Sequence, residues 1–102
     1  MKYVIADSFR GDYQRLSVAE RERFRQALGT FVPACDRFAA DPSVAWPSSL
    51  RVKDVKSAPG VWEMTWSFAG PDGRATFEWI EIDGQPAIRW RRIGGHRILK
   101  QA

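Results

Sequence analysis

The spacing of apolar residues in the first part of the chain indicates a short strand followed by a long helix. The apolar run from Tyr3 to Ala6 is typical of a strand. Ser17-Val18-Ala19-Glu20 has the form of a capping box, in which the Ser17 and Glu20 side chains each bond to the other residue's amide, so a helix is predicted to begin there. Its apolar face follows steps of three and four residues. That face comprises Phe24, Ala27, Leu28, Phe31, Val32, Cys35 and Phe38.

Two stretches around this helix interrupt the pattern. Segment 9–16 has apolar residues on one helical face, but Gly11 weakens a helix, so the segment stays open between helix and loop. Pro33 has no amide hydrogen and its ring clashes with the preceding turn, so it is predicted to kink the helix or to start a new turn. Asp41-Pro42 is predicted to end the helix.

After a loop over Pro42–Ser49 the apolar period becomes two, which is the period of a β-strand. Short turns rich in Gly, Pro and Asp separate the alternating segments, and Asp83-Gly84 is the strongest hairpin signal. The predicted strands are 50–55, Val61–Phe68, Arg74–Ile82 and Ala87–Ile93, with turns at Ser57–Gly60, Gly70–Gly73 and Asp83-Gly84, and with Gly94-Gly95 ending the last strand.

The order of these elements predicts an α+β fold. Strands joined by short turns must be antiparallel neighbours. An N-terminal strand and helices should therefore pack on a mainly antiparallel sheet of four to five strands, with the helices on one face and the other face open to solvent or ligand. A chain of 102 residues fits a single domain spanning residues 1–102.

Composition narrows the classes of protein. Cys35 is the only cysteine, so an internal disulfide framework is excluded, which suits a reducing cytoplasm. The apolar runs are too short for a signal peptide or a membrane-spanning helix, so no membrane partner is expected. One His and one Cys cannot supply a zinc site, and a glycine-rich phosphate loop is lacking. We therefore expect no metal and no cofactor, and any catalysis should rest on His, Glu, Lys and Arg.

The net charge of +4 is unevenly distributed. From Ala87 to the end there are five basic residues and no acidic one. Such a patch attracts phosphates and acidic partners, although it can equally be a solvated edge. The five residues are Arg89, Arg91, Arg92, Arg97 and Lys100.

Two side chains could move protons. His96, the only histidine, follows the basic strand and could act as a general acid or base, or it could be a surface residue without a role. Glu63 could be a general base or could form an ion pair with a basic residue on a neighbouring strand. Phosphate groups could be bound by Arg51, Lys53, Lys56 and Arg74.

The chain has five Trp residues. Trp62 and Trp66 share one face of a strand and are predicted to lie in the core. Trp79 and Trp90 lie beside charged residues and could stack on unpaired bases, but a core position is the favoured interpretation for them too.

Four segments of the chain form a pattern that can be compared with known families. They are Leu50-Arg51-Val52-Lys53, Pro59-Gly60-Val61-Trp62-Glu63, Gly73-Arg74-Ala75-Thr76-Phe77 and Trp90-Arg91-Arg92-Ile93-Gly94-Gly95-His96. Together these segments resemble the RelE/ParE superfamily of toxin–antitoxin toxins. The likeness is closest to members with a C-terminal Arg-Ile-Gly-x-His motif, and it extends over most of the chain.

The resemblance implies a helical layer on a mainly antiparallel sheet. In the ribonuclease branch of the family, basic residues on the sheet bind mRNA and a C-terminal His or Tyr assists the transfer. By motif, Arg92 and His96 match the C-terminal signature, and Arg97 departs from the acidic residue that many members have after the His. Lys53 and Arg51 match the basic strand, Glu63 the acidic position after the turn, and Arg74 the start of the next strand.

The leading hypothesis is a metal-free endoribonuclease toxin that cleaves mRNA, with or without the ribosome. His96, Arg92, Glu63, Arg74 and Lys53 would form its catalytic group. Its alternatives are a non-catalytic ParE-type toxin that binds DNA gyrase and an inactive module that binds RNA or protein. The expected protein partner is an acidic antitoxin chain lying over the face of Arg51, Lys53, Arg89, Arg91 and Arg92. The residues expected to bind RNA are Arg51, Lys56, Arg89, Arg91 and Arg97.

Overall fold

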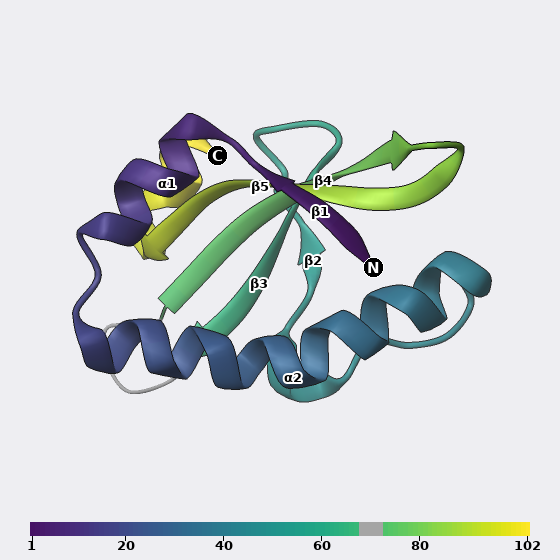
Figure 1. The fold of residues 1–102 in the computed structure, drawn as a ribbon, viewed down its shortest axis with the longest axis horizontal. Helices are drawn as coiled ribbons and strands as arrows, with labels where there is room; N and C mark the ends of the chain where they lie inside the picture. Colours follow the sequence, from purple (N-terminus) through teal and green to yellow (C-terminus); the bar gives the residue numbers. More distant parts are fainter. Residues whose placement is uncertain (68–72) are drawn as a thin grey trace.

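A computed structural model describes residues 1–67 and 73–102, without the side chains of Ser67 and His96. It has two α-helices, a five-stranded sheet and two short 3₁₀ segments (Figure 1). Its elements are β1 (Lys2–Ile5), α1 (Asp7–Gln14), α2 (Val18–Ala40), η1 (Ser48–Leu50), β2 (Lys53–Asp54), β3 (Val61–Ser67), β4 (Gly73–Ile82), β5 (Gln85–Gly95) and η2 (His96–Gln101).

The sheet has the strand order β1-β5-β4-β3-β2. Strands β2 to β5 form the predicted antiparallel meander, whereas β1 lies at the opposite edge and pairs with β5 in parallel. The predicted hairpin at Asp83-Gly84 is confirmed, and the φ angles of 53° and 76° at these two residues are those of a type I′ turn. The α+β prediction is therefore confirmed, with a mixed sheet because of β1.

The observed helices agree with most of the local sequence signals. The capping box is confirmed: the Ser17 hydroxyl accepts from the Glu20 amide at 3.1 Å, and the Ser17 amide donates to the Glu20 carboxylate at 2.8 Å. Helix α2 continues through Pro33, because buried residues on both sides of it pack against the sheet. Segment 9–16 is largely helical, since α1 places Phe9 in the core.

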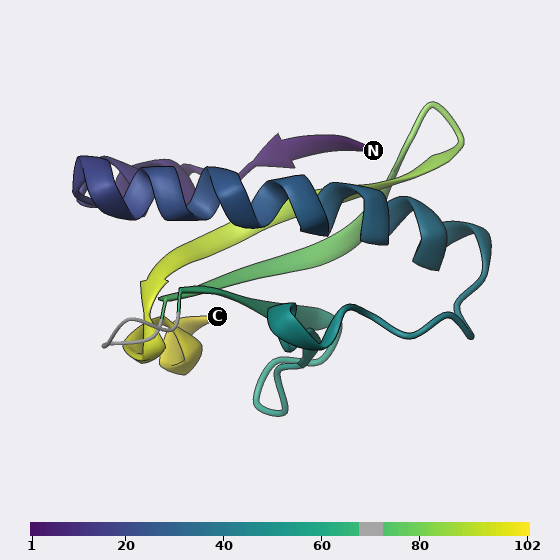
Figure 2. The same ribbon diagram turned by 90° about the horizontal axis from the view of Figure 1, so that it is seen from below.

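Helix α2 lies across one face of the sheet (Figure 2). The core between them is mainly aromatic. The ring centroid of Phe31 lies 5.1 Å from that of Phe77 and 5.2 Å from that of Trp90, and the ring centroids of Phe24 and Trp90 are 5.4 Å apart. Trp90 is thus a core residue, as the favoured interpretation held. Trp79 is partly buried and stacks on Phe38, so neither indole is presented to a base.

The opposite face of the sheet is less open than the sequence pattern predicts. Thr65 and Thr76, which point to this face, are almost fully buried. The segment η2 folds back on this side of the sheet, away from α2, and packs against β4 and β5 through residues such as Ile98 (Figure 2). The apolar residues of η2 form too short a segment for hydrophobic periodicity to predict that η2 covers this face of the sheet.

One predicted strand needs correction, and one predicted turn lies mostly outside the described residues. The strand expected over 50–55 is reduced to Lys53–Asp54, because residues 48–50 form a 3₁₀ turn and Arg51 adopts a left-handed φ of 46°. The predicted turn at Gly70–Gly73 lies outside the described residues except for Gly73. In the described ranges, no helix has the length and apolarity required to cross a bilayer.

Candidate functional site

A carboxylate held between two basic side chains occupies the sheet face opposite α2. Glu63 on β3 is 4% exposed, and its Oε1 lies 3.8 Å from Lys53 Nζ on β2 and 3.7 Å from Arg74 Nε on β4. Lys53 is directly opposite Glu63 in the sheet register, and Arg74 lies diagonally opposite. The sequence-based expectation of a cross-strand ion pair is thus confirmed, with two partners instead of one.

The three residues of this Glu63 cluster differ in their access to solvent. The side chains of Glu63 and Arg74 are 5% and 10% exposed, whereas that of Lys53 is 69% exposed. A buried carboxylate is tolerated when cations compensate its charge. Both distances are longer than an ordinary hydrogen bond. The Glu63 carboxylate therefore attracts the two cations electrostatically at these contacts, without the close geometry of a bidentate arginine–carboxylate pair. Lys53 is therefore the member of the cluster that a ligand in solution can reach.

Two threonines line the same face beside the cluster. Thr76 is directly opposite Glu63, and its hydroxyl accepts a hydrogen bond from the Arg92 amide at 3.0 Å. Thr65 is directly opposite Arg74, and among the described residues its buried hydroxyl has no hydrogen-bond partner. These threonines were not singled out from the sequence, although their alternation with apolar neighbours places them on the face of Glu63 and Arg74.

His96 is the first residue of η2 and follows the end of β5 that pairs with the start of β4. Gly94 pairs with Arg74 and Gly95 pairs with Gly73, so the backbone enters His96 beside the start of β4. Its side chain lies outside the described residues, and its chemical role stays a prediction.

Arg92 is engaged by a residue that the sequence pattern did not indicate. Its Nε and Nη2 donate to the two carboxylate oxygens of Asp12 at 2.6 and 3.1 Å, and the Ile93 amide donates to the same carboxylate at 3.2 Å. These side-chain hydrogen bonds to Asp12 raise the pKa of Arg92 above its ordinary value. Arg92 and Asp12 thus fasten α1 to β5, at a position directly opposite Thr76 in the sheet register.

Two further arginines of the basic C-terminal stretch are also paired. Arg89 and Arg91 both donate to the Glu78 carboxylate, at 2.9 and 3.1 Å. Arg91 also donates to the Ala102 carbonyl. The uniform positive face expected from the local charge count is therefore interrupted, because Asp12 and Glu78 come from other elements.

The remaining predicted RNA contacts lie in two places. Arg51, Lys53 and Lys56 are all exposed and follow one another around β2, and we call them the β2 basic edge. Arg97 is exposed on η2. Lys53 connects the β2 basic edge to the Glu63 cluster through its ion pair.

Comparison with protein-family models, curated proteins and solved structures found no match.

Proposed function

We propose that this chain is a toxin of the RelE/ParE type that cleaves mRNA without a metal. The observation that carries the proposal is a buried carboxylate between two cations, one of which, Arg74, pairs with Gly94, two residues before the only histidine of the sequence. Proton-transfer groups and phosphate-binding groups are the components that metal-free RNA cleavage requires.

In this proposal the RNA approaches along the β2 basic edge. Lys53 contacts the scissile phosphate because its ammonium is exposed while it remains attached to the cluster. Glu63 is a positioning residue that holds Lys53 and Arg74, since its own carboxylate is buried between them. Arg74 adds positive charge behind the phosphate. Arg92, by contrast, acts as a structural clamp with Asp12.

The bond changes follow from RNA chemistry. The 2′-oxygen attacks the adjacent phosphorus as its proton is removed, and the bond from phosphorus to the 5′-oxygen breaks as that oxygen takes up a proton. His96 supplies one of these two proton transfers. The cations stabilise the additional negative charge on the pentacovalent phosphorus. DNA lacks the 2′-hydroxyl and is not cut.

The same proposal includes a cytoplasmic location, where mRNA is available, and an acidic antitoxin chain that silences the toxin. The net charge of +4 on this chain favours association with mRNA and with an acidic antitoxin.

The test compares cleavage of an mRNA, with and without ribosomes and in the presence of EDTA, by wild type and three variants. We expect His96→Ala to slow cleavage by about 10²–10⁴-fold, the usual contribution of a general acid or base. Lys53→Ala should also slow it. Lys2→Ala is the matched control, because Lys2 is equally exposed at 69% and paired with an acidic residue, but lies on β1 at the far edge of the sheet.

Equal cleavage by wild type and His96→Ala would remove the histidine from the mechanism. Inhibition of DNA gyrase by a chain that cuts no RNA would instead favour the ParE-type alternative.

A further inference from the structure

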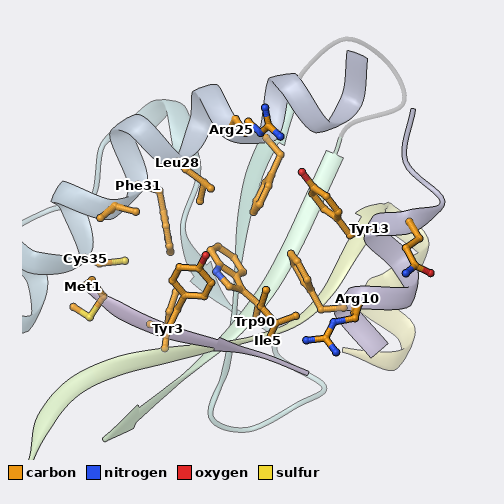
Figure 3. A pocket seen from close by; sticks show the side chains of 15 residues that line it. Met1, Tyr3, Ile5, Arg10, Tyr13, Arg25, Leu28, Phe31, Cys35 and Trp90 are labelled. Carbon is orange, nitrogen blue, oxygen red and sulfur yellow. The ribbon is translucent and has the colours of Figure 1, made fainter. Parts of the chain in front are cut away.

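A mainly apolar groove of about 470 Å³ lies between β1 and α2, on the face of the sheet that α2 covers (Figure 3). Ile88 and Trp90 of β5 form its floor, and Phe24, Leu28 and Phe31 of α2 form one wall. Residues of β1 form the other wall, and α1 closes one end. A cavity of this size with aromatic and aliphatic walls is typical of a site for a small molecule.

The charged side chains that line the groove lie toward one end of it. They are Arg10 of α1 and Arg25 in the first half of α2, and both are exposed. Figure 3 shows both arginines on the side of α1, whereas Met1 and Cys35 lie at the opposite end. Val32, one helical turn before Cys35, also lines the groove. The groove therefore runs from a cationic end to an apolar end.

The cationic end is suited to an anion. Among the described residues that line the groove none is acidic. Arg25 contacts Glu22 at 3.8 Å, but the Arg25 side chain is 71% exposed and such a surface pair is weak. A guanidinium group binds a carboxylate through two parallel hydrogen bonds. An occupant with a carboxylate beside an apolar body would therefore match both parts of the groove.

The position of Cys35 on α2 gives the length of the apolar part. Arg25 and Cys35 lie ten residues apart in this helix, which corresponds to about 15 Å along its axis. With carbon–carbon bonds of about 1.5 Å, an extended chain of about twelve carbons covers that distance. The groove thus has the length and the polarity of a single acyl chain with a charged head group.

Other occupants fit these features less well. A neutral apolar molecule would leave both arginines without a counter-charge. A second copy in a two-fold dimer would bring the same cationic end against itself. A carboxylate with one acyl chain meets the arginines and the apolar walls together.

We propose that the groove binds a small anionic amphiphile, a carboxylate whose single acyl chain has about twelve carbons. The head group lies at Arg10 and Arg25, and the tail extends towards Cys35. The proposal is independent of RNA cleavage, because the groove lies on the sheet face that α2 covers and the Glu63 cluster lies on the opposite face.

The first experiment varies the length of the chain. Octanoate, decanoate, dodecanoate and tetradecanoate are titrated against the protein below their micelle concentrations, and amide chemical shifts in NMR give the dissociation constants. We expect the affinity to rise by about tenfold for each two methylenes added, up to dodecanoate. Tetradecanoate should bind little more tightly, because its tail would extend beyond the groove. The shifted amides should belong to α1, β1 and α2.

The second experiment varies the head group on a constant chain. Decan-1-ol is neutral and decyltrimethylammonium is cationic, and both carry the apolar chain of decanoate. Because neither can accept hydrogen bonds from a guanidinium as a carboxylate does, each should bind about tenfold or more weakly than decanoate.

Two pairs of variants test the two ends of the groove. Arg25→Gln should weaken decanoate binding by about tenfold, whereas Arg23→Gln, the same change at an exposed α2 position outside the groove, should not. Val32→Phe should fill the apolar end, so that dodecanoate binds no more tightly than decanoate. Val18→Phe, at a position that is 82% exposed and outside the groove, should leave the chain-length series unchanged.

RNA cleavage by these four variants should remain at the wild-type rate, so a failure of this proposal is distinguishable from a failure of the proposed function. Four results would overturn the proposed site. These are no saturable binding of dodecanoate, equal binding of decanoate and decan-1-ol, equal losses in Arg23→Gln and Arg25→Gln, and an affinity that keeps rising with chain length to the same extent in Val32→Phe and wild type. A ligand-free dimer in sedimentation that Val32→Phe dissociates would also overturn it, by assigning the groove to a second copy.

Discussion

Individual charged residues in this protein acquire their roles from partners on other elements. Glu63 and Glu78 each contact two basic side chains, but Glu63 is buried and the arginines around Glu78 are partly exposed. The cost of losing either carboxylate should differ accordingly, because a buried cation without its counter-charge is poorly tolerated whereas an exposed one is solvated.

We therefore expect Glu63→Gln to lower the free energy of unfolding by about 3 kcal/mol, because the buried ion pair between Glu63 and Arg74 would be broken. The matched control, Glu78→Gln, should cost about 1 kcal/mol or less. Urea unfolding of the two variants measures the difference. Equal losses would show that burial of the Glu63 cluster contributes nothing to stability.

The buried thiol provides a second residue-scale prediction. Burial raises the pKa of Cys35 to about 12, so the thiol stays protonated at neutral pH. A thiol reagent at pH 8 should react with the native protein far more slowly than with the urea-unfolded chain. Because the folded pKa is raised, Cys35 should also make stability fall as the pH rises from about 9 towards 12, and Cys35→Ala should remove that part of the slope. Native and unfolded reaction rates of equal size would contradict this account.

At the scale of elements, signals between neighbouring residues predicted most of the fold. The capping box and the Asp83-Gly84 turn are local, and each strand of the meander pairs with its sequence neighbour, so short turns and alternation predicted the antiparallel order and a cross-strand ion pair at Glu63. The parallel pairing of β1 with β5 and the Asp12–Arg92 clamp join distant parts of the chain. No periodic pattern encodes such contacts, and Asp12 lay in the segment whose secondary structure stayed open.

A close approach between β3 and β4 gives an element-scale prediction. A Cβ added at Gly73 would overlap the indole of Trp66, whose Nε1 donates to the Arg74 carbonyl at 2.9 Å. Gly73→Ala should therefore lower the free energy of unfolding by about 1–3 kcal/mol through overpacking. Gly95, directly opposite Gly73 in the sheet, has nothing within 4 Å of an added Cβ, so Gly95→Ala should be nearly neutral. Thermal unfolding of both variants would refute the idea if Gly95→Ala were equally destabilising.

At the scale of the whole molecule, exposed positive charge is distributed unevenly over the sheet. The β2 basic edge lies at one side of the sheet. On β5, Glu78 and Asp12 neutralise much of the charge of the three arginines. In the proposed function, RNA phosphates therefore meet the β2 basic edge and not β5.

RNA binding should consequently weaken with salt. If three or four phosphates are neutralised, the slope of log K against log salt should be about −2 to −3 for a single strand. Lys56→Ala, on the β2 basic edge, should reduce the magnitude of that slope by about 0.7, whereas Arg89→Ala should change it less, because Arg89 is paired with Glu78. Filter-binding titrations at several salt concentrations measure the slope, and a flat response would show that the basic edge does not bind phosphates.

In the proposed function, the Glu63 cluster and His96 support cleavage of RNA by its own 2′-hydroxyl. The most direct measurement is mass spectrometry of the products formed in EDTA from an RNA and from the same RNA with a single 2′-deoxy substitution at the cleaved position. We expect a 2′,3′-cyclic phosphate and a 5′-hydroxyl from the first substrate and no cleavage of the second at that position. Products with a 3′-hydroxyl and a 5′-phosphate, or equal cleavage of the deoxy substrate, would contradict it.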